Sequence, residues 1–116
     1  DTRNNELIGQ VVAYIQANYG RDDLSLGMLA DKFHISVSYL SKLFKEKLEM
    51  NFIDYLIVTR LERAKVLLAG SDKKISQIAE SVGYQNMPSF IRIFKKYTDQ
   101  TPSEYRRTHG DAETRE

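Results

Sequence analysis

The sequence predicts an all-α fold of about seven helices, in which two helix-turn-helix subdomains are joined by a long linker helix. Three observations predict this fold. One helical pattern occurs twice, a long helical stretch separates the two copies, and no segment alternates apolar and polar residues over the length of a strand. The expected subdomains are residues 1–50 and 71–109, with the linker helix at 51–70 and a disordered tail at 110–116.

The repeated pattern is a short apolar helix, a tight turn, and a second helix whose outer face is polar and basic. The two short helices are expected near residues 26–33 and 75–82, and their alanines, Ala30 and Ala79, are 49 residues apart. In the second helices, the equivalent phenylalanines at 44 and 94 are 50 residues apart. Because the offset grows by one, the second turn is expected to contain one more residue than the first.

The first copy is preceded by a helix over residues 5–19, where apolar residues recur at helical spacing. Ser25 is in a position to cap the helix over 26–33, and Ser36 to cap a helix over 37–48. Serine suits both positions because its hydroxyl accepts a bond from a backbone N–H that the helix leaves free.

The second copy follows the longest periodic stretch, a helix over 51–69 that Gly70 is expected to end. Its turn falls at 83–85 and its second helix near 87–98. Thr101 then caps a last helix whose first residue is proline, a favoured position for that residue.

Positive charge is concentrated on the repeated part of the chain. The whole chain has a net charge of +1, but residues 26–109 hold 14 Lys/Arg and 9 Asp/Glu, a net +5, whereas the flanks hold 3 and 7, a net −4. This distribution favours a polyanionic partner. No apolar run approaches the roughly 18 residues of a membrane span, and the polar opening does not resemble a signal peptide. We therefore expect a cytoplasmic location and no membrane contact by this segment.

Residues for catalysis or metal binding are sparse. The chain has no cysteine, and its two histidines, His34 and His109, are far apart in the sequence. No two acids are arranged for acid–base chemistry, and no glycine-rich loop is present to hold a phosphate. We therefore expect no enzymatic activity, no metal and no cofactor.

Cationic side chains occupy matched positions on the second helix of each copy. At about 100° per residue, Ser38, Lys42 and Lys45 lie on the outer face of the first copy, and Arg92 and Lys95 take the equivalent places in the second. The inner face of the second copy is expected to carry Phe90, Ile93, Phe94 and Tyr97. A single surface helix often carries lysine and arginine only for solvation. Matched positions in two copies instead favour DNA reading, since either side chain reaches guanine in the major groove.

A longer set of residues extends the pattern. It comprises Tyr55-Leu56, Arg60-Leu61, Ala64, Leu67-Leu68, Ile78-Ala79, Val82-Gly83-Tyr84, Phe90, Arg92, Phe94-Lys95-Lys96 and Thr101-Pro102-Ser103-Glu104-Tyr105-Arg106. These residues resemble the signature of AraC-type (AraC/XylS) transcriptional regulators, over about residues 6–107. The resemblance implies two helix-turn-helix subdomains that bind two successive major-groove segments on one face of double-stranded DNA.

Position by position, the resemblance also implies which side chains touch DNA. Base contacts are expected from Ser38, Ser41, Lys42, Met87, Pro88, Ile91 and Arg92. Residues near helix starts offer backbone N–H groups, and flanking bases offer charge, so phosphate contacts are expected at a second set of positions. That set is Ser36, Lys45, Lys74, Ser76, Lys95 and Lys96.

Three departures from the family pattern affect the expected site. The family commonly has glycine after each reading helix, and this chain has Glu49 and Asp99 there. Glycine accepts the left-handed backbone of a helix stop, whereas Asp tolerates it moderately and Glu poorly. Met87 and Pro88 replace more polar residues, so we expect the second reading helix to sense shape and methyl groups, with Arg92 as its main polar reader.

These observations predict the sequence-specific DNA-binding domain of a bacterial transcription regulator, an activator associated with the nucleoid and in contact with RNA polymerase. We expect it to be attached to a sensing or dimerisation domain. The linker of roughly 18 residues spans about 27 Å, against a groove repeat of about 34 Å, so DNA deformation should contribute to specificity. The alternative is a helical interaction module that docks on a receptor domain or RNA polymerase. That alternative predicts an exposed apolar stripe on residues 51–69.

Overall fold

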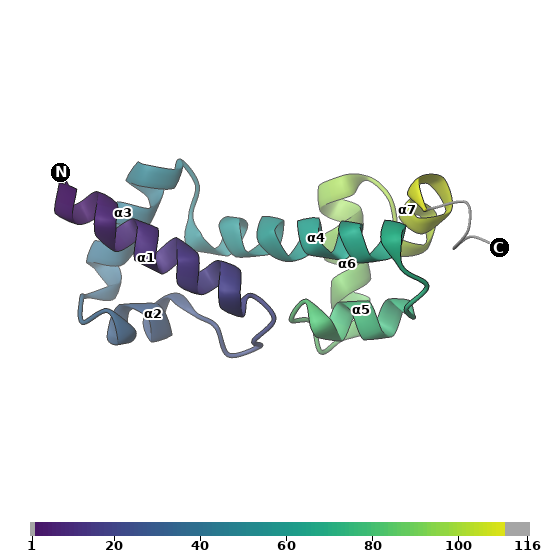
Figure 1. The fold of residues 1–116 in the computed structure, drawn as a ribbon, viewed down its shortest axis with the longest axis horizontal. Helices are drawn as coiled ribbons and strands as arrows, with labels where there is room; N and C mark the ends of the chain where they lie inside the picture. The colour runs from purple at the N-terminus through teal and green to yellow at the C-terminus, as the bar shows by residue number, and fades with distance from the viewer. Residues whose placement is uncertain (1, 111–116) are drawn as a thin grey trace. The chain divides into compact units, whose positions relative to one another are not determined.

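The computed structural model describes residues 2–110, and these residues form seven α-helices and no strand. Along the chain (Figure 1) the helices are α1 (Thr2–Asn18), α2 (Leu26–Lys32), α3 (Val37–Leu48), α4 (Phe52–Gly70), α5 (Ile75–Ser81), α6 (Met87–Thr98) and α7 (Pro102–His109). The all-α prediction is confirmed. Residues 111–116 of the predicted tail lie outside the described part of the chain. Gly110, which we had included in that tail, is buried and donates its N–H to the Arg106 carbonyl at 2.8 Å.

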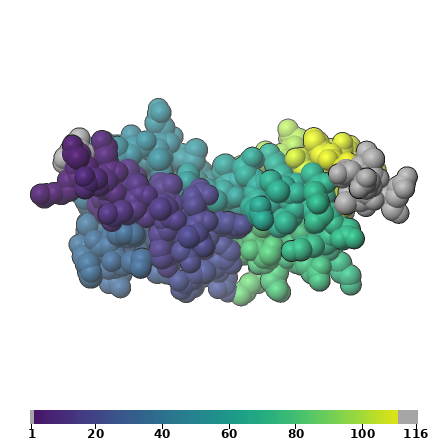
Figure 2. Space-filling view, viewed as in Figure 1, coloured from purple at the N-terminus to yellow at the C-terminus, as the bar shows by residue number. Residues whose placement is uncertain are grey.

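The chain divides into two compact units, residues 1–59 and 60–116, with the boundary inside α4. In the first unit, α3 packs against both α1 and α2. Figure 2 shows the atoms of α1, in purple, beside those of the following segment, in blue. The core of this unit consists of Ile8, Val11, Ile15, Leu24, Leu29, Ala30, Leu40, Leu43, Phe44, Phe52 and Leu56.

The second unit buries the same kinds of side chain, and α6 packs against α5 and α7. Its buried apolar residues are Leu61, Ala64, Leu68, Ile78, Ala79, Val82, Phe90, Phe94 and Pro102. Three of them, Leu61, Ala64 and Leu68, have the spacing of Ile8, Val11 and Ile15 in α1. The second half of α4 therefore serves the second unit as α1 serves the first.

The internal repeat extends beyond the helix-turn-helix. Phe44 meets Tyr55 edge to face, with ring centroids 5.4 Å apart, and 50 residues later Phe94 meets Tyr105 in the same way at 5.6 Å. The helix starts also correspond, because Asn51 caps α4 through its side chain and residue 101 caps α7. The start of α4 is thus the counterpart of α7, and each unit is a repeat of four helical segments.

The turns inside the two copies share one backbone conformation. In the first turn, the Ile35 N–H donates to the Ala30 carbonyl at 3.0 Å, and in the second the Tyr84 N–H donates to the Ala79 carbonyl at 2.9 Å. A hydrogen bond from an N–H to the carbonyl five residues earlier requires a residue with left-handed backbone between them. That residue is His34 (φ 59°) in the first turn and Gly83 (φ 110°) in the second. The first turn holds four residues and the second five, so the predicted insertion is confirmed.

One expectation about helix ends was wrong, and a second holds for the position of the end but not for its backbone conformation. The first helix begins at Thr2 rather than near residue 5. Gly70 is the last residue of α4 and does not form a left-handed stop, because Gly83 is the one glycine with positive φ among the described residues. The end of α4 is held by side chains instead, including the Ser71 hydroxyl, which donates to the Leu67 carbonyl at 2.7 Å.

Candidate nucleic-acid interface

The second helix of each copy, α3 or α6, begins with a side-chain cap. The Ser36 hydroxyl accepts the N–H of Tyr39 at 3.0 Å, as predicted, and the Asn86 side chain accepts the N–H of Ser89 at 3.0 Å. These bonds fix where each helix starts and therefore which side chains its outer face carries. Ser36 can still meet a phosphate, because its hydroxyl hydrogen remains available when its oxygen accepts.

The outer face of α3 carries three residues that the sequence predicts to contact bases. Ser38, Ser41 and Lys42 are exposed, while Leu40 and Phe44 are fully buried on the opposite side. Within the described chain, the first three side chains make no hydrogen bond or ion pair. Their polar groups are therefore available to a ligand outside the domain.

The outer face of α6 has a different chemistry. Pro88, Ile91 and Arg92 are exposed and Met87 is half-buried, so the four predicted base contacts are accessible. Arg92 stands at the place that Lys42 occupies in α3. Tyr97, which we had expected to point inward, is 40% exposed and lies beneath the ammonium of its neighbour Lys96.

The six predicted phosphate contacts are all exposed: Ser36, Lys45, Lys74, Ser76, Lys95 and Lys96. Two of them lie at the start of α5, where the Lys74 N–H is already bound by the Gln77 side chain at 3.1 Å. The cationic side chains of this set, and not that backbone group, are the groups left for a phosphate.

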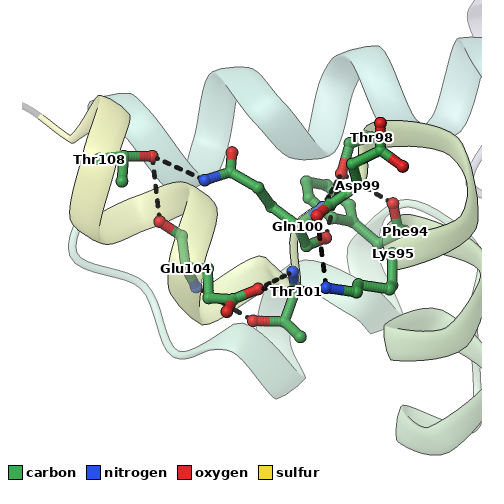
Figure 3. A network of polar contacts seen from close by, with 8 residues as sticks. All are labelled: Phe94, Lys95, Thr98, Asp99, Gln100, Thr101, Glu104 and Thr108. Atoms are coloured by element: carbon green, nitrogen blue, oxygen red, sulfur yellow. Dashed lines mark hydrogen bonds and ion pairs between the residues drawn. The ribbon is translucent and has the colours of Figure 1, made fainter.

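Lys95 differs from its counterpart Lys45. Its ammonium donates to the Asp99 carbonyl at 3.3 Å and lies 3.8 Å from the Glu104 carboxylate, as Figure 3 shows for the carbonyl. The Lys45 ammonium makes no such contact in the described chain. The two matched lysines are therefore not equivalent, because only Lys95 is already partly neutralised.

The turn between α6 and α7 is built from a polar network (Figure 3). The Thr101 hydroxyl accepts the Glu104 N–H at 3.1 Å, and the Glu104 carboxylate accepts the Thr101 N–H at 2.8 Å. These bonds to Thr101, with a smaller contribution from Lys95, hold the pKa of Glu104 below its usual value. The carboxylate thus lies, charged, 3.8 Å from the Lys95 ammonium.

A buried arginine supports the second turn, and the sequence did not reveal its role. Arg60 is only 8% exposed, and its guanidinium carbon lies 5.3 Å from the ring centroid of Tyr84. A Cβ on Gly83 would fall 2.7 Å from this guanidinium. Tyr84 in turn packs on Phe90 of α6, with centroids 5.6 Å apart, and burial raises the pKa of Tyr84. Arg60 therefore connects α4 to the turn that positions α6.

A second arginine closes the end of α4. Arg106 of α7 donates from Nε to the Leu68 carbonyl at 3.1 Å and from Nη2 to the Ser71 carbonyl at 3.2 Å. The last carbonyls of a helix have no partner within the helix, and at a glycine stop backbone N–H groups bind them. Here the Arg106 guanidinium donates those hydrogen bonds instead. The residue belongs to the motif quoted above, but no local sequence signal indicated a contact 38 residues away.

Other classes of site lack support in the described chain. Between residues 2 and 110 no three His, Cys, Asp or Glu side chains are grouped to hold a metal ion. Over the same residues, no helix is both long and apolar enough to cross a membrane. His34 is an exposed turn residue, as expected from the sequence.

Two equivalent helices carry cations, Lys42 and Arg92, that are exposed at the same register and unpaired within residues 2–110. This arrangement is typical of helix-turn-helix proteins that bind DNA. Comparison with known families agrees, because residues 29–108 match the family described as "Helix-turn-helix domain". The chain belongs to this family, as the DNA-binding domain of an AraC-type transcriptional regulator.

Curated relatives are longer proteins. The chain is 39% identical over 108 residues to the uncharacterized HTH-type transcriptional regulator YijO of Escherichia coli, covering 93% of this chain and 38% of the relative. It is 41% identical over 103 residues to an uncharacterized HTH-type transcriptional regulator of Staphylococcus aureus, covering 89% of this chain and 14% of the relative. The chain thus spans well under half the length of both relatives.

Solved structures share the fold. The C-terminal domain of AraT, a response regulator from Geobacillus stearothermophilus, superposes with a TM-score of 0.90 at 36% identity, covering 92% of this chain and 88% of that one. An AraC-type regulator from Chromobacterium violaceum gives 0.82 at 27% identity, covering 97% and 99%. The DNA-binding domain of AdpA, solved with a target DNA, gives 0.81 at 21% identity, covering 86% and 89%, a likeness of fold alone.

Proposed function

We propose that this domain binds DNA sequence-specifically by inserting α3 and α6 into two successive segments of the major groove. The observation that carries the proposal is the match between Lys42 and Arg92. Both are long cations, both are exposed and unpaired in the described chain, and both lie mid-face on helices that the repeat makes equivalent. Either side chain can bind the O6 and N7 acceptors of guanine.

The remaining exposed residues divide by chemistry. Those beside the two mid-face cations are proposed to contact bases: Ser38, Ser41, Met87, Pro88 and Ile91. Those at helix starts or further along the helices are proposed to contact phosphates: Ser36, Lys45, Lys74, Ser76, Lys95 and Lys96. Phosphate contacts fix position, and base contacts carry the sequence information.

In the whole protein, we propose that the domain serves a bacterial activator that contacts RNA polymerase at the nucleoid, in the cytoplasm. The greater length of the relatives supports attachment to a further sensing or dimerisation domain. The continuous helix α4 belongs to both units and is 19 residues long, about 28 Å. We further propose that DNA deformation contributes to specificity.

The alternative, a protein-docking module, requires an apolar stripe on α4. Ile53, Val58 and Val66 are exposed there. However, Glu62 lies between Val58 and Val66 on the same side of the helix and carries a charge paired with Lys65 at 2.9 Å. A charge within this face argues against an apolar docking surface.

The test compares Lys42→Ala and Arg92→Ala on a duplex selected by the domain from a random library. Each variant should weaken specific binding by about 1–3 kcal/mol, the value of a bidentate base contact. Base preference should relax in two different half-sites, roughly 10 base pairs apart. If both variants relax the same base pairs, two readers are not in use.

A salt series separates the phosphate contacts. Lys45→Ala should reduce affinity for every sequence and flatten the salt dependence, because one fewer counterion is released. Lys95→Ala should do so less, because Glu104 and Asp99 already hold its ammonium. If either variant alters base preference at an unchanged salt slope, that lysine is a base reader.

A further inference from the structure

We infer that the half-site bound by α6 is recognised through the C5-methyl groups of thymine, which contact an apolar patch formed by Met87, Pro88 and Ile91. This inference rests on the proposed function, in which α6 lies in the major groove. It adds the class of base pair that the second helix selects.

The patch is continuous on the outer face of α6. Ile91 lies three residues after Pro88 and four after Met87, and residues at those spacings are neighbours on a helix surface. Ile91 is 37% exposed, Pro88 is exposed and Met87 is half-buried. The patch therefore presents carbon to the outside of the domain.

Two polar groups at the start of α6 are occupied or missing. The Asn86 side chain accepts the Ser89 N–H at 3.0 Å, so its oxygen is directed into the helix. Pro88 has no N–H to donate. Arg92, one turn later, is the next residue on this face with polar atoms to offer a base. Beside it, the exposed atoms of Met87, Pro88 and Ile91 offer apolar contact.

The equivalent surface of α3 shows that the fold does not require an apolar patch at these positions. Ser38 and Ser41 stand where Pro88 and Ile91 stand in α6, at the 50-residue offset. Both serines are exposed and offer hydroxyl groups that donate and accept. Val37, 49% exposed, stands where Met87 stands, so both helices begin with an apolar residue. They differ at the next two positions of this face, where α3 presents hydroxyl groups and α6 presents carbon.

DNA is the occupant that the charges favour. The same helix carries Arg92, Lys95 and Lys96, which suit a polyanion and not an apolar protein surface. Residues 60–116 hold 11 Lys/Arg and 8 Asp/Glu, a net +3. In the major groove the thymine methyl is the apolar group that a base pair presents, and aliphatic side chains contact it. A patch of carbon beside cations therefore matches a thymine next to a guanine.

The experiment removes methyl groups without changing base pairing. The domain selects a duplex from a random library, and the half-site in which Arg92→Ala relaxes preference is assigned to α6. Thymines of one half-site at a time are then replaced by deoxyuridine. In the α6 half-site each contacted methyl should be worth roughly fourfold in affinity, the value of one buried methylene. In the α3 half-site the same replacement should change affinity less than twofold.

Matched variants assign the effect to the patch. Ile91→Ser gives α6 the side chain that α3 has at position 41, and it should lose most of the deoxyuridine effect, whereas Ile91→Val should keep most of it. Ser41→Ile is the reciprocal control and should create sensitivity in the first half-site. Thermal melts check that each variant is folded, which is expected because both positions are exposed.

Three results would overturn the inference. The selected α6 half-site could lack thymine. The deoxyuridine effect could persist undiminished in Ile91→Ser, which would assign it to DNA flexibility. The domain could select no sequence at all, and that result alone would remove the proposed function as well.

Discussion

Among residues 2–110, three residues other than glycine have a left-handed backbone, which L side chains adopt only with strain. His34, Glu49 and Asp99 all have positive φ, at 59°, 58° and 65°. The last two follow α3 and α6, where each N–H donates to a carbonyl four residues earlier, Lys45 or Lys95, at 2.9 Å. Left-handed backbone is confirmed at both positions where the family commonly has glycine. His and Asp adopt this region more readily than Glu, so the greatest strain is expected at Glu49.

Replacing these stops by glycine should stabilise the domain. We expect Glu49→Gly to raise the free energy of unfolding by about 1 kcal/mol and Asp99→Gly by about 0.5 kcal/mol, because relief of strain exceeds the entropy that glycine adds to the unfolded chain. The Lys95 bond to residue 99 should survive, since it is made to a backbone carbonyl. Thermal and urea melts measure both values.

Gly83→Ala is the matched control, for which we expect the opposite change in stability. Its φ of 110° disfavours any side chain, and the added Cβ would fall 2.7 Å from Arg60, so it should destabilise where the other two stabilise. A lower melting temperature for Glu49→Gly than for the parent would show that strain at this stop is negligible.

At the scale of single elements, the end of α4 depends on a residue from another helix. Arg106 binds two carbonyls there, at Leu68 and Ser71, from two different nitrogens. The interaction replaces the glycine stop that the sequence indicated. It also ties α7 to α4 within the second unit, because the donor and the acceptors come from opposite ends of that unit's sequence.

Arg106→Lys should therefore lower the free energy of unfolding by about 1–3 kcal/mol, because a lysine keeps the charge but has one nitrogen and leaves a carbonyl unsatisfied. Urea melts measure the loss. Arg63→Lys is the control, since Arg63 is exposed and makes no hydrogen bond or ion pair within the described chain. Equal stabilities for the two variants would mean that water satisfies the end of α4 without Arg106.

The elements themselves could be predicted because their signals are local. Apolar spacing, the caps at Ser25 and Ser36, and Thr101 before Pro102 each act within a few residues, and the structure has all of these helices. The contacts of Arg60 and Arg106 could not be predicted, because they join residues 24 and 38 positions apart. The exposure of Tyr97 was missed because helical spacing predicts a direction and not how deeply neighbouring helices cover it.

The accessible surface of the candidate site was predictable for a similar reason. Once the inner face of a helix is known, the helical period alone identifies the outward residues. Four residues identified in this way are all exposed: Ser38, Lys42, Pro88 and Arg92. The helical period does not show which outward side chains already bind other groups of the same protein. Lys45 and Lys95 have the same register, but only Lys95 has a carboxylate 3.8 Å away.

At the scale of the whole molecule, charge is divided unequally between the two units. Residues 1–59 hold 6 Lys/Arg and 8 Asp/Glu, a net −2, whereas residues 60–116 have a net +3. The two repeats therefore share a fold but differ in their attraction to phosphate. Within the proposed function, the second unit supplies most of the electrostatic affinity, and the first adds discrimination through Ser38, Ser41 and Lys42.

One matched pair isolates this difference. Glu46 on α3 is the counterpart of Lys96 on α6 at the 50-residue offset, and both are exposed. Glu46→Lys should tighten binding to every DNA sequence and steepen the dependence of log affinity on log salt by about 0.9, the contribution of one further phosphate contact. Lys96→Glu should weaken binding and flatten the slope. Glu46→Gln separates removal of repulsion from gain of a contact, because it should tighten binding with a smaller change in slope. If Glu46→Lys instead tightened binding to the selected site alone, this position of α3 would face bases, and the division of charge between the units would not set the affinity.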